Sequence, residues 1–140
     1  RARQLRNLIR QYNGGGDKPI HFTEIGWPTG SATRTVSELG QAKFLARAYV
    51  LSLAAGVERA FWYDFVNDGV EDDKREQNFG LIHAEADPNG AYTPKPGYVA
   101  YAVAARQLSG AVFVAQDPAP DGVMNYRFRA PSGDVSVLWV

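Results

Sequence analysis

Two short apolar segments, separated by a long amphipathic one, constrain the fold more than any other feature of the sequence. Residues 20–25 and 59–65 are rich in branched and aromatic side chains, which is typical of β-strands. Between them, apolar residues recur at helical spacing through residues 35–56. A strand, a helix and a second strand in this order predict two parallel strands joined by a crossover helix.

The central helix has sequence signals at both ends. Its start, Thr35-Val36-Ser37-Glu38, has the form of a capping box. We expect the Thr35 hydroxyl to accept a hydrogen bond from the third helical amide, and Glu38 to reach back. Gly56 predicts the end of the helix, because glycine adopts the left-handed conformation without strain.

The remainder of the chain also divides into expected elements. A helix is predicted up to about Tyr12, and another over Pro96–Ser109, where a proline suits the first turn. Residues 66–94 predict a long polar loop, and loops of this length are often functional. Three antiparallel strands are expected after Gly110, over residues 112–115, 123–128 and 135–140.

This order of elements indicates an α/β protein, but two parallel strands are too few to form a covered sheet. We therefore expect residues 1–110 to be the closing part of a longer α/β sheet or barrel. Residues 111–140 would then begin a small β domain. A helical pattern is already under way at Arg1 and a strand pattern stops at Val140, so the expectation is a piece of a longer protein.

Composition excludes several classes of function. Fifteen basic residues balance fifteen acidic ones, so the chain has no net attraction for nucleic acid or an anionic membrane. No apolar run approaches the ~20 residues of a membrane-spanning helix. The sequence has no cysteine, which rules out disulfides, cysteine-ligated zinc and thiol catalysis within these residues.

Glu24 is the main candidate for chemistry. It stands at the C-terminal end of the first predicted strand, and parallel α/β proteins bind ligands at that edge. The alternative is a solvated glutamate that caps the next turn. Trp27 and Trp62 could pack against sugar rings. The alternative is packing in a core, which the sequence favours more for Phe61 and Tyr63 than for the two tryptophans.

No cofactor or metal is expected from the motifs. The acidic stretch that begins at Asp64 fails the EF-hand pattern, because Val66 and Arg75 occupy ligand positions, and an irregular cation site in this stretch is left as an alternative. His21 and His83 lack paired spacing and are expected to be packed or surface histidines. A nucleotide site is disfavoured because no glycine-rich phosphate-binding motif is present.

Four motifs in order carry a resemblance to a known family. They are HFTEIGWPTG (21–30), AFWYDFVNDG (60–69), NFGLI (78–82) and TPKPGYVAY (93–101). Together they resemble the C-terminal part of clan A glycoside hydrolases of the family 39-like or family 5-like type. The Glu-Ile-Gly-Trp-Pro string is also similar to family 17 β-1,3-glucanases.

The resemblance implies the C-terminal portion of a (β/α)8 TIM barrel with a retaining mechanism. Residues 20–24 would be strand seven, residues 59–65 strand eight, and 96–109 the last barrel helix. Glu24 would be the catalytic nucleophile, with Trp62, Trp27 and Asp64 as substrate-binding residues. The acid/base glutamate, which ends strand four in this clan, would be missing from this chain, so the fragment alone is predicted to be inactive.

The whole protein is accordingly expected to act on an oligo- or polysaccharide and to be secreted or associated with the cell envelope, as is usual in the family. Two alternatives remain open. One is a non-catalytic glycan-binding or structural relative of the barrel. The other is a free-standing small α/β domain that binds a protein.

Overall fold

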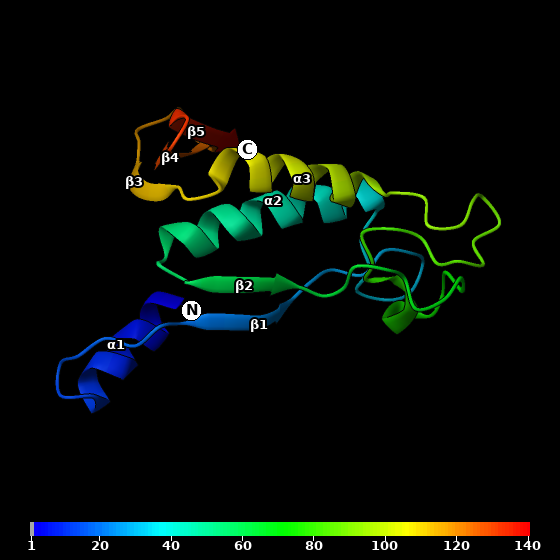
Figure 1. The fold of residues 1–140 in the computed structure, drawn as a ribbon, viewed down its shortest axis with the longest axis horizontal. Coiled ribbons are helices and arrows are strands. Elements are labelled where there is room, and N and C mark those ends of the chain that lie inside the picture. The colour runs from blue at the N-terminus through cyan, green and yellow to red at the C-terminus, as the bar shows by residue number, and fades with distance from the viewer. Residues whose placement is uncertain (1) are drawn as a thin grey trace. The chain divides into compact units, whose positions relative to one another are not determined.

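The two central strands pair in a parallel sheet. The computed structural model describes residues 2–140, apart from the side chain of Arg3. Strands β1 (His21–Ile25) and β2 (Arg59–Trp62) are hydrogen-bonded neighbours. The amide of Glu58 donates to the Ile20 carbonyl and that of Tyr63 to the Ile25 carbonyl, both at 2.9 Å. Residue numbers therefore increase in the same direction along both strands (Figure 1).

Strand β2 is shorter than the predicted segment 59–65, because the hydrogen bonding of the chain changes partner after the Tyr63 amide. The Asp64 amide donates to the Phe79 carbonyl, and the Phe65 carbonyl accepts from the amides of Leu81 and Ile82. The backbone from Asp64 onward is therefore bound to the long loop instead of to β1.

Three helices occupy the predicted segments. They are α1 (Ala2–Tyr12), α2 (Glu38–Ala54) and α3 (Pro96–Leu108). Pro96 begins α3, as predicted. Within residues 2–140, no helix combines the length and apolar character that crossing a membrane requires.

The predicted cap of α2 was wrong by two residues. Ser37 is the capping residue, because its Oγ accepts a hydrogen bond from the Gly40 amide at 3.0 Å. The Thr35 hydroxyl donates instead to the carbonyls of Gly30 (2.7 Å) and Ala32 (2.6 Å). The Thr35 hydroxyl is therefore bound within the loop that precedes α2, and it does not cap the helix.

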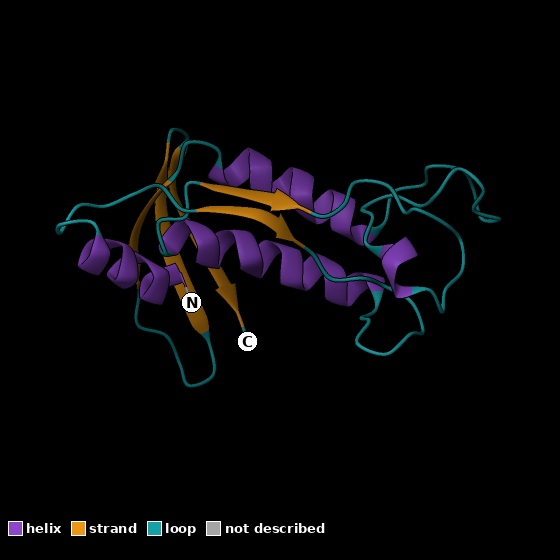
Figure 2. Cartoon of the chain, turned by 90° about the horizontal axis from the view of Figure 1, so that it is seen from below, coloured by secondary structure: helices purple, strands orange, loops and turns teal. Residues whose placement is uncertain are grey.

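The last three strands are antiparallel, as the sequence predicts, and they pair in the order β3-β4-β5. Their bounds are Val112–Gln116, Met124–Ala130 and Gly133–Trp139. Figure 2 shows these strands as a meander connected by loops. Residues 131–132 form the turn between β4 and β5, where Ala130 pairs with Gly133. Gly133 has a φ of 124°, a conformation that favours glycine.

Contacts between Cα atoms divide the chain into two compact units. The first contains residues up to 23, residues 49–60 and residues from 107 onward. The second contains residues 24–48 and 61–106. The unit boundaries fall inside β1, β2, α2 and α3. The second unit carries Glu24, Trp27, Trp62 and the whole long loop.

The first unit has a hydrophobic core against one face of the β3-β4-β5 sheet. Its buried members are Val50, Leu108, Tyr126 and Phe128. Phe113 packs edge-on against Phe128 with ring centroids 5.7 Å apart. This core requires side chains from α2 and α3 as well as from the sheet.

We predict that Phe128→Ala strongly destabilises this unit. Phe128 is fully buried, and removing a buried phenyl ring costs about 3–5 kcal/mol because a cavity remains. Leu138→Ala, in the neighbouring strand, is the control, because Leu138 is 58% exposed. Hydrogen exchange of the amides in residues 124–139 of the whole protein would measure both effects. Equal losses of protection in the two variants would contradict the burial argument.

Candidate functional site

Glu24 lies near the C-terminal end of β1 with an exposed side chain. The two hydrogen bonds that align β1 and β2 bring Phe61 to the same level of the sheet as Glu24. Directly opposed residues of neighbouring strands project from the same face. Phe61 is also 53% exposed, so the expectation that it packs in a core was wrong for the described residues. The side chains of Glu24 and Phe61 are therefore both accessible to groups that do not belong to the described residues.

Trp27 and Trp62 form one aromatic group with Phe44 of α2. The Trp27 ring lies 5.9 Å from Trp62 and 5.4 Å from Phe44, between ring centroids, and both pairs are tilted. Trp27 and Trp62 are both half-buried. The indole N–H of Trp62 is buried and has no hydrogen-bond partner among the described residues. The two tryptophans therefore come together in space and keep part of their surface accessible.

Asp64 follows β2 and is the most perturbed carboxyl group of the site. Burial, together with the charge of Asp68, raises the pKa of Asp64 from 3.8 to about 6, and the positive charge of Lys95 opposes this shift. Its Oδ1 atom is buried and has no hydrogen-bond partner among the described residues. A half-buried carboxylate with a free acceptor suits contact with a hydroxyl group of a ligand.

Tyr63 also belongs to this region, although the sequence favours core packing more for Tyr63 than for the two tryptophans. Its ring packs edge-on against Phe79 at 5.3 Å between centroids. Burial raises the pKa of Tyr63, and the charges of Asp64, Asp68, Glu76 and Glu24 add to the effect. Glu24 therefore lies within electrostatic range of the Tyr63 phenol.

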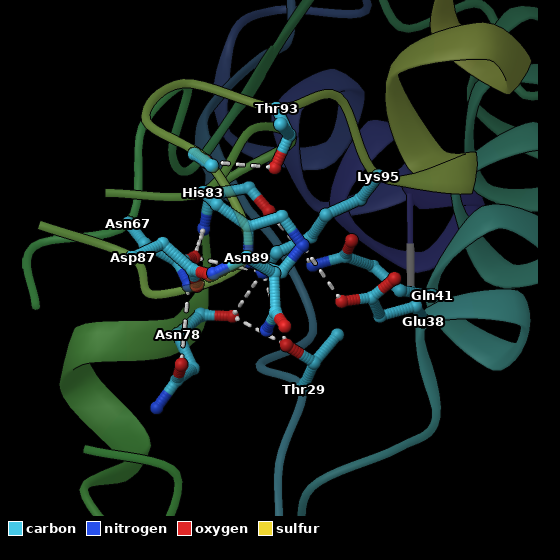
Figure 3. Close-up of polar contacts among 12 residues, drawn as sticks. Thr29, Glu38, Gln41, Asn67, Asn78, His83, Asp87, Asn89, Thr93 and Lys95 are labelled. Carbon is cyan, nitrogen blue, oxygen red and sulfur yellow. Dashed lines mark hydrogen bonds and ion pairs between the residues drawn. The ribbon is translucent and has the colours of Figure 1, made fainter. Parts of the chain in front are cut away.

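A buried lysine connects the loops that follow the two strands (Figure 3). Lys95 is only 1% exposed, and its ammonium donates to Asn67 Oδ1 (2.7 Å), Thr29 Oγ1 (3.0 Å) and the Asn78 carbonyl (3.4 Å). Thr29 lies in the loop after β1, whereas Asn67 and Asn78 lie in the loop after β2. Burial lowers the pKa of Lys95 to about 8, against the opposing charges of Glu38, Asp64 and Asp87. The amine is therefore still largely charged at neutral pH.

Gln41 of α2 makes a second connection between the same loops. It is fully buried, and its Nε2 donates to the carbonyls of Trp27 (2.9 Å), Phe79 (3.2 Å) and Gly80 (3.4 Å). Gly80 packs directly against the backbone of Val66 and Asn67. Only glycine fits there, because a Cβ at this position would overlap those two residues. Gln41 thus fixes the backbone of Trp27 against the long loop.

His83 lies between two carboxylates at the side of a polar cleft. Its Nε2 is 3.2 Å from Glu38 Oε1 and its Nδ1 is 3.0 Å from Asp87 Oδ2. These three residues line a cleft of about 470 Å³ together with Thr29, Asn67, Asn78 and other residues of the two loops. Glu24, Trp27, Trp62 and Asp64 do not line it. The cleft is therefore separate from the residues that the sequence singled out.

The structure contains no arrangement of metal ligands in residues 2–140: no three His, Cys, Asp or Glu side chains are grouped to hold an ion. In the acidic stretch after Asp64, the Asn67 oxygen binds the Lys95 ammonium and accepts from the Gly80 amide at 3.0 Å. His21 is exposed, and its Nε2 atom lies 4.0 Å from Glu58 Oε2.

Lys95 and Gln41 are the residues that sequence reasoning missed. The only local signal at Lys95 is its position between two prolines at the start of a helix. Gln41 interrupts the apolar pattern of α2 without any distinguishing motif. Their roles depend on loops far away in the sequence, such as Asn67, which is 28 residues from Lys95.

Comparison with solved structures finds a match over almost the whole chain. The chain is similar to a solved structure described as a family 39 glycoside hydrolase from the gut symbiont Bacteroides cellulosilyticus WH2, with a TM-score of 0.80 and 30% sequence identity. The match covers 99% of this chain and 27% of that chain. No family model matches the sequence, and neither does any curated protein. This mixed α/β chain therefore matches a part of the chain of a family 39 glycoside hydrolase, which is one of the two families that its sequence motifs resemble.

Proposed function

We propose that these residues are the C-terminal part of the catalytic barrel of a retaining glycoside hydrolase, with the start of a small β domain after residue 110. The observation that carries this proposal is the structural match to a family 39 glycoside hydrolase over nearly the whole chain. The parallel pairing of β1 and β2, with a helix between them, is consistent with two adjacent barrel strands.

Glu24 is the proposed nucleophile. It is exposed at the C-terminal end of β1, and barrel enzymes carry their catalytic groups at that end of the strands. In a retaining mechanism it would attack the anomeric carbon, while a second carboxyl group ~5–5.5 Å away protonates the leaving oxygen and later activates water. That second group would come from another strand of the barrel. The isolated 140-residue chain is therefore expected to be inactive.

Trp27, Trp62 and Asp64 are the proposed substrate-binding residues. The accessible parts of the two indole rings suit the C–H face of a sugar, and the free Asp64 oxygen suits a sugar hydroxyl. The substrate would be an oligo- or polysaccharide, and such enzymes act in secreted form or at the cell envelope.

The test is the stereochemistry of hydrolysis by the whole protein. Incubation with a panel of aryl β-glycosides, followed by proton NMR of the first product formed, is expected to show retention of the anomeric configuration. Inversion would contradict the assignment of Glu24 as a nucleophile. A complete lack of hydrolysis, combined with binding of a glycan, would favour the second candidate, a non-catalytic glycan-binding relative.

A further inference from the structure

The imidazole ring of His83 meets a carboxylate at each of its two nitrogens (Figure 3). Its Nε2 atom lies 3.2 Å from Glu38 Oε1, and its Nδ1 atom lies 3.0 Å from Asp87 Oδ2. A neutral imidazole has a single N–H group, so its other nitrogen would direct a lone pair at a carboxylate oxygen. Only the protonated ring can donate to both carboxylates. The arrangement therefore suits the imidazolium ion and not the neutral ring.

The two carboxylates belong to segments that are far apart in sequence. Asp87 lies in residues 84–92 of the long loop, and its amide donates to the Ala84 carbonyl at 3.2 Å. Glu38 is the first residue of α2. Both segments are parts of the second compact unit. The His83 side chain therefore connects this part of the loop to the start of α2.

The contact with Glu38 is the weaker of the two. The Asp87 side chain is only 12% exposed, and its Oδ1 atom also accepts from the Asn89 amide at 2.8 Å. The Glu38 side chain is 38% exposed and can turn toward water. A carboxylate in the first turn of a helix is also stabilised by the helix dipole, so Glu38 can stay charged without a partner. A neutral His83 would therefore keep its N–H on Asp87 and lose the contact with Glu38.

Other charged groups surround this contact. Lys95 lies directly before α3, and its positive charge attracts both Glu38 and Asp87. Asp72, from the loop after β2, lines the same cleft as these residues. Imidazole changes its charge between pH 5 and 8, whereas the pKa of Lys95 is lowered by burial to about 8. The titration of the ring therefore precedes that of the lysine as the pH rises.

We propose that His83 is a proton-dependent tie that holds residues 84–92 against the start of α2 at low pH and releases them as the pH rises. Glu38, His83 and Asp87 line the polar cleft of about 470 Å³, so release of the tie would free one side of this cleft. The tied form binds the proton more tightly than the released form. Its stability is therefore present below the titration of the ring and is lost above it. This inference does not depend on the proposed function.

The first test measures the titration of His83 in the whole protein. Deuterium exchange at the imidazole C2 position, followed against pH by mass spectrometry of peptides, gives a midpoint for each histidine. Glu38→Gln removes one carboxylate and keeps the size of the side chain, so the His83 midpoint is expected to fall by about 0.5 pH unit. Equal midpoints in the wild type and in Glu38→Gln would overturn the inference.

Glu58→Gln is the matched control for Glu38→Gln. Glu58 faces His21, the second histidine of these residues, with 4.0 Å between Oε2 and the imidazole Nε2. The control makes the same chemical change next to a different ring, so it should leave the His83 midpoint unchanged. A fall of the same size in Glu58→Gln would show a general effect of lost charge and would also overturn the inference.

The second test measures the release of the loop. A midpoint difference of about 0.5 pH unit corresponds to about a threefold change in the opening equilibrium. In the whole protein, protection of the amides in residues 84–93, corrected for intrinsic exchange rates, is therefore expected to fall about threefold between pH 5 and 7.5. In Glu38→Gln it should stay constant, because the glutamine amide can donate to the neutral ring.

His83→Gln is a second variant for the same measurement, since it removes the titrating ring and should also abolish the dependence on pH. Constant protection in the wild type would overturn the release of the loop. A threefold fall that persists in both variants would overturn the role of His83 and assign the dependence to another group, such as Asp64, whose pKa is about 6.

Discussion

Replacing Glu24 with glutamine in the whole protein is expected to lower kcat/KM on aryl glycosides by a factor on the order of 10⁴ or more. The amide has nearly the same size as the carboxylate but cannot attack the anomeric carbon. Because the Glu24 side chain is exposed, the substitution should leave the fold intact. The melting temperature of the variant should therefore match that of the wild type.

A covalent trap distinguishes the nucleophile from other essential groups. A 2-deoxy-2-fluoro glycoside with a good leaving group should form a stable ester with the nucleophile, because the fluorine slows hydrolysis of the intermediate. Mass spectrometry of a digest is expected to find the sugar on the peptide that contains Glu24. Exposed Glu58, near the start of β2, gives the control variant Glu58→Gln, which should retain full activity. Labelling of a different carboxylate would refute the assignment of Glu24.

Substitution of Gly26 with alanine is the second change with a large expected effect. A Cβ at this position would overlap the carbonyl oxygen of Tyr63 and would lie 3.2 Å from the Phe79 ring. The strand ends must then separate, which breaks the hydrogen bond from the Tyr63 amide to the Ile25 carbonyl. We expect a loss of about 2–4 kcal/mol in stability. Displacement of Glu24 from Trp62 and Asp64 should also reduce activity by about 100-fold or more.

Gly40→Ala is the control for Gly26→Ala. Gly40 lies in the first turn of α2, and its added Cβ would lie 3.2 Å from Ser37 Oγ and 3.3 Å from the Val36 Cβ, so a small local adjustment suffices. Alanine also favours the helix over glycine. Urea unfolding of the whole protein and kcat/KM should change little in this variant. A similar loss in both variants would contradict the close approach of the strand ends as the cause.

The order of the elements was predictable because it depends on local patterns. The periodicity of α2, the proline at the start of α3 and the alternation in the last three strands each extend over only a few residues. Glu24 could also be located at a strand end from its own segment. The cap of α2 was assigned to the wrong residue, because Thr35 is followed by Glu38 at the capping-box spacing whereas Ser37 is followed by Gly40. The Thr35 hydroxyl is bound in the preceding loop, and Ser37 caps the helix instead.

The polar interior was beyond prediction because its partners are distant in sequence. The ammonium of Lys95 meets Thr29, 66 residues away, and the amide of Gln41 meets Phe79, 38 residues away. No local pattern encodes such contacts. The exposure of Phe61 could not be predicted either. An aromatic residue in a strand is expected to be buried, and its own segment does not show whether another part of the structure covers it.

The hydrogen bond between the side-chain amides of Asn67 and Asn78 bears on how an insertion in the long loop would affect the protein. Asn67 Nδ2 donates to Asn78 Oδ1 at 3.1 Å and closes a section of the long loop whose residues 71–76 are all exposed. Each doubling of a flexible loop costs only about 0.6 kcal/mol in closure entropy. The closure entropy of an insertion within residues 71–76 should therefore be small, and its main cost should be the loss of the hydrogen bonds from Asn78 Nδ2 to the carbonyls of Glu71 and Lys74, both at 2.9 Å.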